Sequence, residues 1–372
     1  MLEQGVTRRC DVLIVGGGPA GSSCARDLVR AGLDVVVLER ARFPREKPCA
    51  GWITPGVVSA LDLDLDEYAR GRTLQPIRGF ETGVLGGRRV VSRFDSTISH
   101  AIRRSEFDDY LLTRAGASVV QEVPVTRIER ARDRWLVNGT FEAPMLVGAG
   151  GHFCPVARQL NPSCPEAPLV AAQEIEVRVG AARPDRRPVD GEIPELYFCR
   201  DLRGYGWVVR KGEYLNVGFG RRDRHGLACA SRQFLQALRT AGRVPSDFPE
   251  AWPGHAYLLY GVPQRRVHED GVLLTGDAAG LAYPTSGEGI LTAVESGRLA
   301  AGTILSAGGH YTRDRLGAYV QGLVNRYGTP GPATPTGWHL PPSLVARAGR
   351  CLMAWPWFSR HVLVERRFLH AA

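Results

Sequence analysis

Glycine and acidic residues that suit phosphate and ribose binding open the chain. Gly16, Gly18 and Gly21 follow the apolar run 12–15, and Glu39 ends the next apolar run. Glycines at this spacing let a backbone turn approach a pyrophosphate, and the next helix directs its first N–H groups at the phosphates. The carboxylate then accepts hydrogen bonds from ribose hydroxyls. The pattern predicts a strand–turn–helix–strand unit that binds a dinucleotide.

Two later segments add to this pattern, which is weak alone because short glycine motifs recur by chance. Gly276 and Asp277 end a third apolar run. Gly287 and Gly289, just before Ile290, stand at the start of a helix that is predicted at about 287–307. The N-terminus of a helix favours negative charge, such as the charge on a reduced flavin. Together the three segments favour FAD over NAD as the ligand.

The order of these segments resembles the flavoprotein group that contains aromatic hydroxylases, flavin-dependent halogenases and geranylgeranyl reductases. The resemblance covers most of residues 8–310. It implies that Asp277 reaches the ribityl and phosphate region of FAD, that Arg104 (with Asp108 in an R-x-x-x-D element) reaches a phosphate, and that the Val125 backbone meets adenine. The residues predicted to bind FAD are Gly16, Gly18, Pro19, Ala20, Gly21, Glu39, Arg40, Cys49, Ala50, Gly51, Arg104, Val125, Gly276, Asp277, Gly287, Gly289 and Ile290.

Cys49 is the first candidate for acid chemistry. Residues 43–56 resemble the K-P-C-G-G segment of geranylgeranyl reductases, which runs past the isoalloxazine ring, although Ala50 replaces a glycine there. A thiol at this place would donate a proton or tune the flavin. The alternative is a small buried residue chosen for its fit, since free cysteines are often part of the core. Trp52 would narrow the space beside the flavin.

Tyr205 and Trp207 are the other predicted catalytic residues. Together with residues 216–218 they resemble the Y-x-W-x-F-P…N-V-G strand pair that lines the substrate cavity of the reductases. Flavin halogenases carry W-x-W-x-I-P at the place of the first motif. Val209 and Arg210 replace the final apolar–proline pair, and this departure weakens the halogenase interpretation more than the reductase one. The alternative is an ordinary strand rich in aromatic residues.

The segment 145–158 bears on the source of electrons. Gly150 stands where the group carries an Asp, and Cys154 stands where hydroxylases carry a Ser. The missing carboxylate makes direct reduction by NADPH uncertain, and no second glycine motif offers a separate NAD domain. The external donor therefore stays open between NADPH, ferredoxin and a flavin reductase. His152 is either a structural loop residue or a proton relay.

Composition excludes several classes of partner. The chain has 372 residues, 44% of them hydrophobic, and a formal charge of +9. Of its 47 basic residues only Lys47 and Lys211 are lysine, and the arginines are scattered, which predicts no nucleic-acid partner. The eight cysteines show no metal-ligand spacing, so we expect no metal and free thiols in a reducing cytoplasm. No apolar run reaches the roughly 18 residues of a bilayer span.

The elements that must position these residues predict an α/β fold. We expect a discontinuous Rossmann-like FAD-binding domain, an inserted antiparallel β-sheet domain for an apolar small-molecule substrate, and a helical C-terminal tail. A β-meander is predicted at 119–129, 133–138 and 141–148. The tail either packs over the substrate domain or makes peripheral membrane contact. The predicted boundaries are 1–72, 101–167 and 265–327 for the FAD domain, 73–100 and 168–264 for the substrate domain, and 328–372 for the tail, which begins with a Pro/Gly-rich connector.

Three functions follow from the resemblance. The first is an FAD-dependent oxidoreductase that reduces carbon–carbon double bonds of an apolar or isoprenoid-like substrate by hydride transfer from reduced flavin N5. The second is a monooxygenase or halogenase that acts through a flavin C4a–oxygen adduct. The third is a non-catalytic binder of prenyl or lipid ligands, which the intact phosphate and Gly-Asp segments disfavour. Oxygen or halide dependence distinguishes the first from the second.

Overall fold

Two units, each built from three stretches of the chain, make up the structure. The computed structural model describes residues 7–162, 169–179, 189–222, 226–261, 265–284, 286–330 and 342–369. Unit 1 comprises Met1–Arg45, Ser105–Pro168 and Tyr257–Ala333, and unit 2 comprises Glu46–Arg104, Leu169–Ala256 and Thr334–Ala372. The domain boundaries drawn from the sequence remain a prediction. They differ from these units in placing residues 46–72 with the FAD domain and in separating the tail from the substrate domain.

A six-stranded sheet forms the centre of unit 1. Its order is β19-β20-β13-β2-β3-β9, parallel except for β19 at one edge. Every residue of the four central strands is buried, as expected of parallel strands covered on both faces. The bounds are β2 Val12–Val15, β3 Val35–Leu38, β9 Ser118–Val120, β13 Met145–Gly148, β19 His268–Glu269 and β20 Val272–Leu274.

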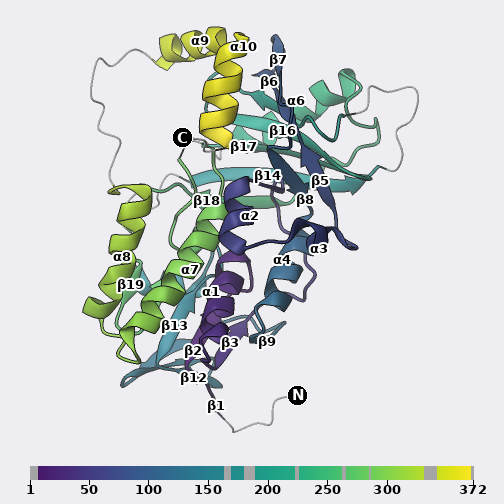
Figure 1. The fold of residues 1–372 in the computed structure, drawn as a ribbon. Coiled ribbons are helices and arrows are strands. Elements are labelled where there is room, and N and C mark those ends of the chain that lie inside the picture. The colour runs from purple at the N-terminus through teal and green to yellow at the C-terminus, as the bar shows by residue number, and fades with distance from the viewer. Residues whose placement is uncertain are drawn as a thin grey trace. The chain divides into compact units, whose positions relative to one another are not determined.

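Helices α1 and α7 pack closely on this sheet and lie side by side (Figure 1). Their approach depends on Gly297, because a β-carbon there would collide with the Ala20 carbonyl oxygen. Pro19 at the first turn of α1 needs no N–H partner and favours helix initiation. The helices are α1 Pro19–Arg30, α5 Pro155–Leu160, α7 Ile290–Ala307 and α8 Arg313–Tyr327, the 3-10 turn η2 spans Gly276–Ala278, and α4 Arg104–Arg114 starts at the unit boundary.

A second, four-stranded sheet in unit 1 replaces the predicted meander in part. Its order is β1-β12-β11-β10, with β1 Arg8–Arg9, β10 Ile128–Ala131, β11 Arg134–Val137 and β12 Phe141–Ala143. The single strands predicted at 119–129 and 141–148 were wrong, since each is two strands in different sheets. Pro124 and Pro144 explain the breaks, because proline has no N–H to continue a ladder.

Unit 2 is built on a seven-stranded sheet of order β18-β14-β17-β16-β15-β6-β7. Neighbours are antiparallel where their register is given, except that β15 runs parallel to β6. A smaller sheet, β4-β8-β5, accompanies it. The bounds are β4 Trp52–Ile53, β5 Leu74–Ile77, β6 Gly79–Val84, β7 Arg89–Arg93, β8 Ser99–Ile102, β14 Leu169–Arg178, β15 Glu195–Phe198, β16 Gly204–Lys211, β17 Tyr214–Arg221 and β18 Gly254–Leu258. Helices α2 Pro55–Leu61, α3 Leu65–Ala69 and α6 Leu227–Thr240 complete this part.

Each face of the large sheet carries a buried core over the central strands. Helix α6 covers one face, where Phe234 packs against Tyr197 and Phe219. The other face carries an apolar core that we call the aromatic cluster, formed by Trp52, Phe80, Phe198, Tyr205, Trp207 and Phe368. Because both faces are covered over the central strands, strands there that alternate polar and apolar residues must bury their polar side chains as well.

The C-terminal helices close the face that carries the aromatic cluster. They are α9 Pro342–Met353, α10 Pro356–Phe358 and the π-helix η3 Ser359–Phe368. The Phe368 ring meets Trp52 and Tyr205 edge-on, at centroid distances of 6.1 and 5.7 Å. The tail therefore packs on the substrate sheet, the first of its two predicted positions. Most of the predicted connector, residues 331–341, lies outside the described residues.

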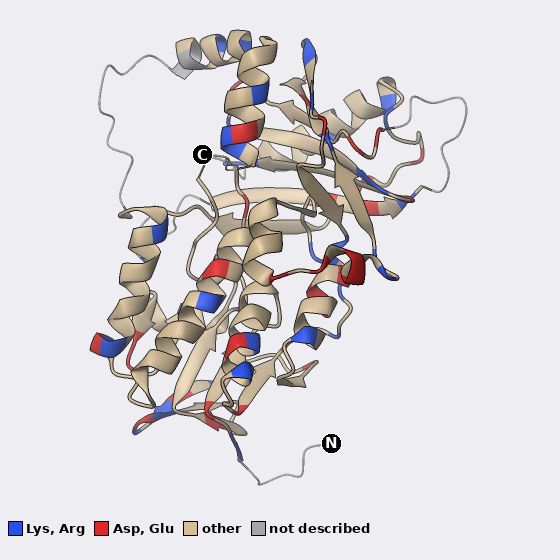
Figure 2. Cartoon of the chain, in the orientation of Figure 1, with Lys and Arg blue, Asp and Glu red and all other residues tan. Residues whose placement is uncertain are grey.

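Surface features bear on the remaining predictions. Trp355 and Trp357, between α9 and η3, are 55% and 54% exposed. Across the described residues, no helix has both the length and the apolar character that crossing a bilayer requires. In the same part of the chain, no three His, Cys, Asp or Glu side chains are grouped to hold a metal ion. Figure 2 shows that acidic and basic positions are scattered over the elements of both units, most of whose length carries neither.

Candidate functional site

The glycine turn after β2 has the shape that its spacing predicts. Gly16 has a φ of +111°, which an L side chain rarely adopts. A β-carbon on Gly21 would collide with the carbonyl oxygen of Gly16, so only glycine lets the first turn of α1 approach the strand end. The backbone N–H groups at the start of α1 are not capped by a side chain, because the N-cap residue is Gly18. This is an anion-binding geometry.

Glu39 is fixed beside this turn. Its Oε2 accepts a hydrogen bond from the Gly17 amide at 2.8 Å, and its Oε1 accepts one from the Ala41 amide at 3.0 Å. Each carboxylate oxygen keeps a lone pair for a further donor. The side chain is thus held at the place where the sequence predicts a ribose contact.

A cation, Arg45, also lies at this turn, and the sequence motifs did not predict it. A β-carbon on Gly18 would lie 3.6 Å from Arg45 Nη2, and Arg45 pairs at 3.3 Å with the fully buried Asp108. Its Nη1 is buried and has no hydrogen-bond partner among the described residues. An orphaned guanidinium nitrogen beside a helix N-terminus fits the pyrophosphate of FAD. Arg104, the predicted phosphate ligand, is buried at the first position of α4, and its role remains a prediction.

The Gly-Asp turn and the start of α7 meet the glycine turn within unit 1. Gly276 has a φ of +56°, its amide donates to Ser296 Oγ at 3.0 Å, and a β-carbon on it would lie 3.2 Å from Ala20 Cβ. A β-carbon on Gly289, the N-cap of α7, would lie 3.3 Å from Asp277 Oδ1. The structure thus brings together the three segments from which the sequence predicted an FAD site, and this grouping is compatible with one bound FAD molecule.

Gly287 and Ile290 complete this corner. Gly287 has a φ of +75° and lies against the Tyr257 hydroxyl, while α7 begins at Ile290 rather than at the predicted residue 287. The positive φ explains the later start, because the backbone is not helical at Gly287. Arg40 is exposed, and Val125 is half-buried in the irregular stretch between β9 and β10. The FAD contacts expected of Arg40 and Val125 remain predictions.

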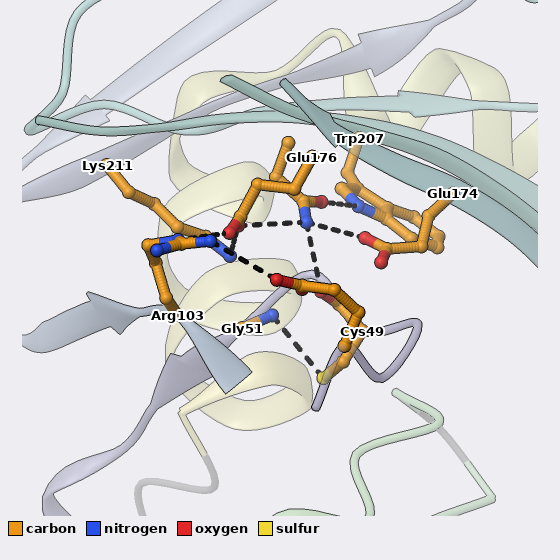
Figure 3. Close-up of polar contacts among 9 residues, drawn as sticks. Cys49, Gly51, Arg103, Glu174, Glu176, Trp207 and Lys211 are labelled. Carbon is orange, nitrogen blue, oxygen red and sulfur yellow. Dashed lines mark hydrogen bonds and ion pairs between the residues drawn. The ribbon is translucent and has the colours of Figure 1, made fainter. Parts of the chain in front are cut away.

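In unit 2, Cys49 belongs to a hydrogen-bonded network (Figure 3). Its Sγ accepts a bond from the Gly51 amide at 3.4 Å, and its carbonyl accepts one from Asn216 Nδ2 at 3.2 Å. Trp207 Nε1 in turn donates to Asn216 Oδ1 at 2.8 Å. Two of the predicted catalytic residues are therefore linked, with Trp207 orienting the amide that holds the Cys49 peptide.

Glu174 of β14 completes this support. Its Oε2 accepts a hydrogen bond from Asn216 Nδ2 at 2.5 Å, and the carboxyl also accepts one from the Cys49 amide. The side chain is 7% exposed. Burial raises the pKa of Glu174 to about 7, against the opposing effects of Lys211 and the hydrogen bonds. Glu174 therefore changes charge near neutral pH while it contacts the Cys49 segment.

A buried ion pair lies next to Glu174 on the same face. Lys211 is 1% exposed and donates to Glu176 Oε2 at 2.7 Å, and Arg103 Nε donates to Glu176 Oε1 at 2.7 Å. Burial alone would raise the pKa of Glu176, but the two cations hold it below its usual range. Gly51, with a φ of +65°, lies directly against Lys211 Nζ. The pair thus supports the turn that follows Cys49.

Compared with wild type, Glu174→Gln is expected to be more favourable for stability at pH 8 than at pH 5. A carboxyl in an unfolded chain titrates near pH 4.3, so between about pH 4.3 and pH 7 the folded state binds more protons and stability falls as pH rises. The variant lacks this titration. The change that the substitution causes in the free energy of unfolding should therefore be about 1–3 kcal/mol more favourable at pH 8 than at pH 5. Urea unfolding of the variant and wild type at both pH values measures the change.

Glu176→Gln is the matched control, because it lies two residues away on the same face. Its pKa is depressed, so its charge contributes stability above the unfolded pKa, and its loss leaves Lys211 buried beside a neutral group. We expect destabilisation at both pH 5 and pH 8. Parallel pH profiles for the two variants would contradict the assignment of a neutral-range pKa to Glu174.

The aromatic residues singled out from the sequence, Trp52, Tyr205 and Trp207, also lie in unit 2. Trp207 is buried, and its ring occupies the space that a side chain at Gly218 would fill, since Gly218 pairs with Trp207 across the sheet. Tyr205 lies 6.0 Å from Trp207 between ring centroids. Trp52 packs edge-on against Phe80 at 5.8 Å. The polar network around Cys49 thus borders the aromatic cluster through Trp207.

Sequence reasoning missed four members of this network: Arg103, Glu174, Glu176 and Lys211. For Lys211 one signal was available in the sequence, namely the rarity of lysine. A chain that has arginine at nearly all its basic positions and lysine at only two suggests that the lysine is needed at those two places. A compact ammonium fits against the Gly51 turn where a guanidinium fork is larger. The other lysine, Lys47, contacts both ring nitrogens of His255, at 3.1 and 3.0 Å. Nothing local distinguished Glu174 from a solvent-facing glutamate.

Comparison with known proteins assigns this arrangement to a family. Residues 11–87 match the family model described as FAD dependent oxidoreductase. The chain is 30% identical over 331 residues to the chloroplastic geranylgeranyl diphosphate reductase of Oryza sativa subsp. japonica, covering 82% of this chain and 68% of the relative. It is 32% identical over 332 residues to the menaquinone reductase of Mycolicibacterium smegmatis, covering 81% and 77%.

Solved structures share the fold. A geranylgeranyl bacteriochlorophyll reductase-like protein from Thermoplasma acidophilum superposes with a TM-score of 0.72 at 20% identity, covering 94% of this chain and 88% of that one. A flavin-dependent halogenase, CmlS, gives a TM-score of 0.67 at 21% identity, covering 93% and 72%. The α/β fold, the FAD cofactor and the enzyme class predicted from the sequence are thus confirmed. The chain belongs to the family of FAD-dependent oxidoreductases that includes the geranylgeranyl diphosphate reductases and menaquinone reductases.

Proposed function

We propose that this enzyme reduces carbon–carbon double bonds of an apolar, isoprenoid-like substrate. The observation that carries the proposal is the placement of Cys49 in unit 2. Its peptide is held by Asn216 and Glu174, and Asn216 is in turn held by Trp207 at the edge of the aromatic cluster. A proton donor fixed at the border of an apolar surface suits the protonation of a hydrocarbon carbon.

The residues of each unit have separate tasks in this proposal. When bound, reduced FAD supplies a hydride from N5, and with it two electrons, to one carbon of the double bond. The Cys49 thiol donates the proton to the other carbon, directly or through a water placed by Tyr205, and regains a proton from solvent. The amides at Gly287 and Gly289 would balance negative charge on the reduced cofactor. The Glu174–Asn216 pair keeps the thiol segment in position.

An anaerobic reoxidation experiment tests the reaction. The FAD-loaded enzyme is reduced chemically and mixed with a polyprenyl acceptor without oxygen, and separately with air alone. We expect fast flavin reoxidation and a product heavier by two hydrogen atoms with the acceptor, and slow reoxidation in air. If turnover of the same compound requires oxygen or halide, the reductase assignment fails and the second candidate replaces it.

A monooxygenase or halogenase is that second candidate, supported by the shared fold of the halogenase structure. Strand β16 disfavours it, because Val209 and Arg210 continue the strand where the halogenase motif carries a proline. As a flavin oxidoreductase the enzyme requires a substrate and an electron source. An external donor (NADPH, ferredoxin or a flavin reductase) remains a prediction. Membrane contact of the C-terminal tail, which exposes Trp355 and Trp357, also remains a prediction.

A further inference from the structure

Helix α9 has apolar residues on two sides, and only one side packs on unit 2. Ala346 and Met353, on the inner side, are buried where α9 lies along β6 and meets α10 and η3 (Figure 1). On the other side, Leu344, Ala348 and Leu352 are exposed. Their spacing of four residues places these three side chains in one row along the helix surface. The tail thus packs on the substrate sheet and still presents a second apolar row to solvent.

Two exposed tryptophans follow directly on this row. The Trp355 amide donates to the Leu352 carbonyl at 3.0 Å, and the Trp355 and Trp357 rings pack together at 5.6 Å between centroids. Of the seven large hydrophobic side chains exposed in the described residues, four lie within residues 344–357. We call these four the tail patch: Leu344, Leu352, Trp355 and Trp357. Single exposed apolar residues are ordinary on a protein surface, whereas a group of them marks an interaction site.

The segment that carries the tail patch is strongly basic. Residues 342–369 contain one acidic residue and five arginines: Arg347, Arg350, Arg360, Arg366 and Arg367. The whole chain, in contrast, has 47 basic and 38 acidic residues, and Figure 2 shows the basic positions on these C-terminal helices. The one acid, Glu365, pairs at 3.5 Å with Arg360 and at 2.8 Å with His361. Arg347 is exposed on α9, one turn from Leu344, so a cation flanks the apolar row.

This combination of charge and residue type decides what covers the tail patch. A second copy of the chain does not suit it, because a symmetric contact would bring the same arginines together. An anionic lipid surface suits both parts. Tryptophan rings favour the boundary between head groups and acyl chains, and arginines are attracted to the negative surface and bind lipid phosphates.

We propose that the tail patch docks the protein on the surface of an anionic lipid bilayer. The tryptophan rings and the two leucines enter the head-group region, while Arg347 and the other arginines of the tail contact lipid phosphates. Because α9 is held on the sheet by its other side, docking does not require the helix to leave unit 2. The proposal goes beyond the reaction proposed above and does not depend on it.

Vesicle flotation of the FAD-loaded enzyme tests the surface without substrate or reductant. The vesicles are phosphatidylcholine alone or an equal mixture of phosphatidylcholine and phosphatidylglycerol. We expect wild type to bind the mixed vesicles more tightly than the neutral ones, and less tightly as salt rises. Trp355→Ser/Trp357→Ser should bind the mixed vesicles at least about 10-fold more weakly, because two large apolar rings are lost. Both side chains are exposed, so the fold should remain intact.

Arg347→Gln tests the charge separately from the rings. It should weaken binding to the mixed vesicles by about five-fold and leave binding to neutral vesicles unchanged. Two matched controls remove similar groups elsewhere: Phe153→Ser, an exposed aromatic residue of unit 1, and Arg232→Gln, an exposed arginine on α6. Both controls should bind vesicles as wild type does.

The proposal is overturned if the double tryptophan variant binds the mixed vesicles as wild type does, or if wild type binds neutral and mixed vesicles equally. Sedimentation velocity without lipid covers the other occupant. A wild-type dimer that dissociates in the tryptophan variant, with no vesicle binding, would assign the tail patch to a contact between copies of the chain. Because vesicle binding is measured without turnover, a failure of the proposed reaction would leave this result unchanged.

Discussion

Gly21→Ala is expected to weaken FAD binding by roughly 100-fold or more, about 3 kcal/mol. The added β-carbon would overlap the Gly16 carbonyl oxygen, so the turn must move away from α1. That movement displaces the N–H groups at the start of the helix and the Glu39 contact to Gly17, both of which we assign to the cofactor. Fluorescence titration of the flavin-stripped variant with FAD measures the loss.

Gly302→Ala provides the same chemical change in an open place. Gly302 lies on the exposed side of α7, and no atom would contact its β-carbon. We expect unchanged FAD affinity and a gain of about 0.5–1 kcal/mol in the free energy of unfolding, because alanine is the better helix former. Equal FAD affinity in the Gly21 and Gly302 variants would refute the assignment of the glycine turn.

Cys49→Ala is expected to slow substrate reduction by about 100-fold or more, the range for loss of a positioned general acid. The FAD content should not change, because most of the predicted cofactor contacts come from unit 1, and the contact predicted for residue 49 does not require a thiol. Stopped-flow reoxidation of the reduced enzyme by a polyprenyl acceptor isolates this step from cofactor reduction. Cys49→Ser should also be slow, since a hydroxyl is a far weaker acid than a thiol.

Cys229→Ala controls for the loss of a thiol elsewhere. Cys229 is exposed on α6 and takes no part in the network of Figure 3. Its variant should reduce the acceptor at the wild-type rate. Unchanged turnover in Cys49→Ala would remove Cys49 from the mechanism and leave a Tyr205-bound water as the proton source.

The cofactor site was predictable because its requirements are local. A turn that must approach a phosphate needs glycine at fixed positions, and Gly16, Gly21 and Gly276 have the backbone angle or the close neighbour that excludes other residues. Arg45 escaped notice because its partner, Asp108, comes from a distant helix. A cation that reaches a site through tertiary packing leaves no spacing in the sequence.

The polar network in unit 2 was hidden by strand periodicity. Residues 173–177 read as a strand with one polar and one apolar face, which places Glu174 and Glu176 toward water. In the structure helix α6 buries the apolar face, and the Cys49 segment covers the polar one. The pairing of Glu176 with Asn216 depends on the register of β14 and β17, which alternation alone does not set.

The position of Phe368 has a consequence for how this protein is made. On a ribosome, most of the substrate sheet and Trp52 are complete long before residues 359–368 emerge. Until then the aromatic surface that η3 covers has no cover of its own. Exposed apolar surface on an unfinished chain promotes aggregation and recruits chaperones. The second unit thus completes its core only after residues 359–368 have left the ribosome, and its yield in a cell depends on protection of the nascent chain up to that point.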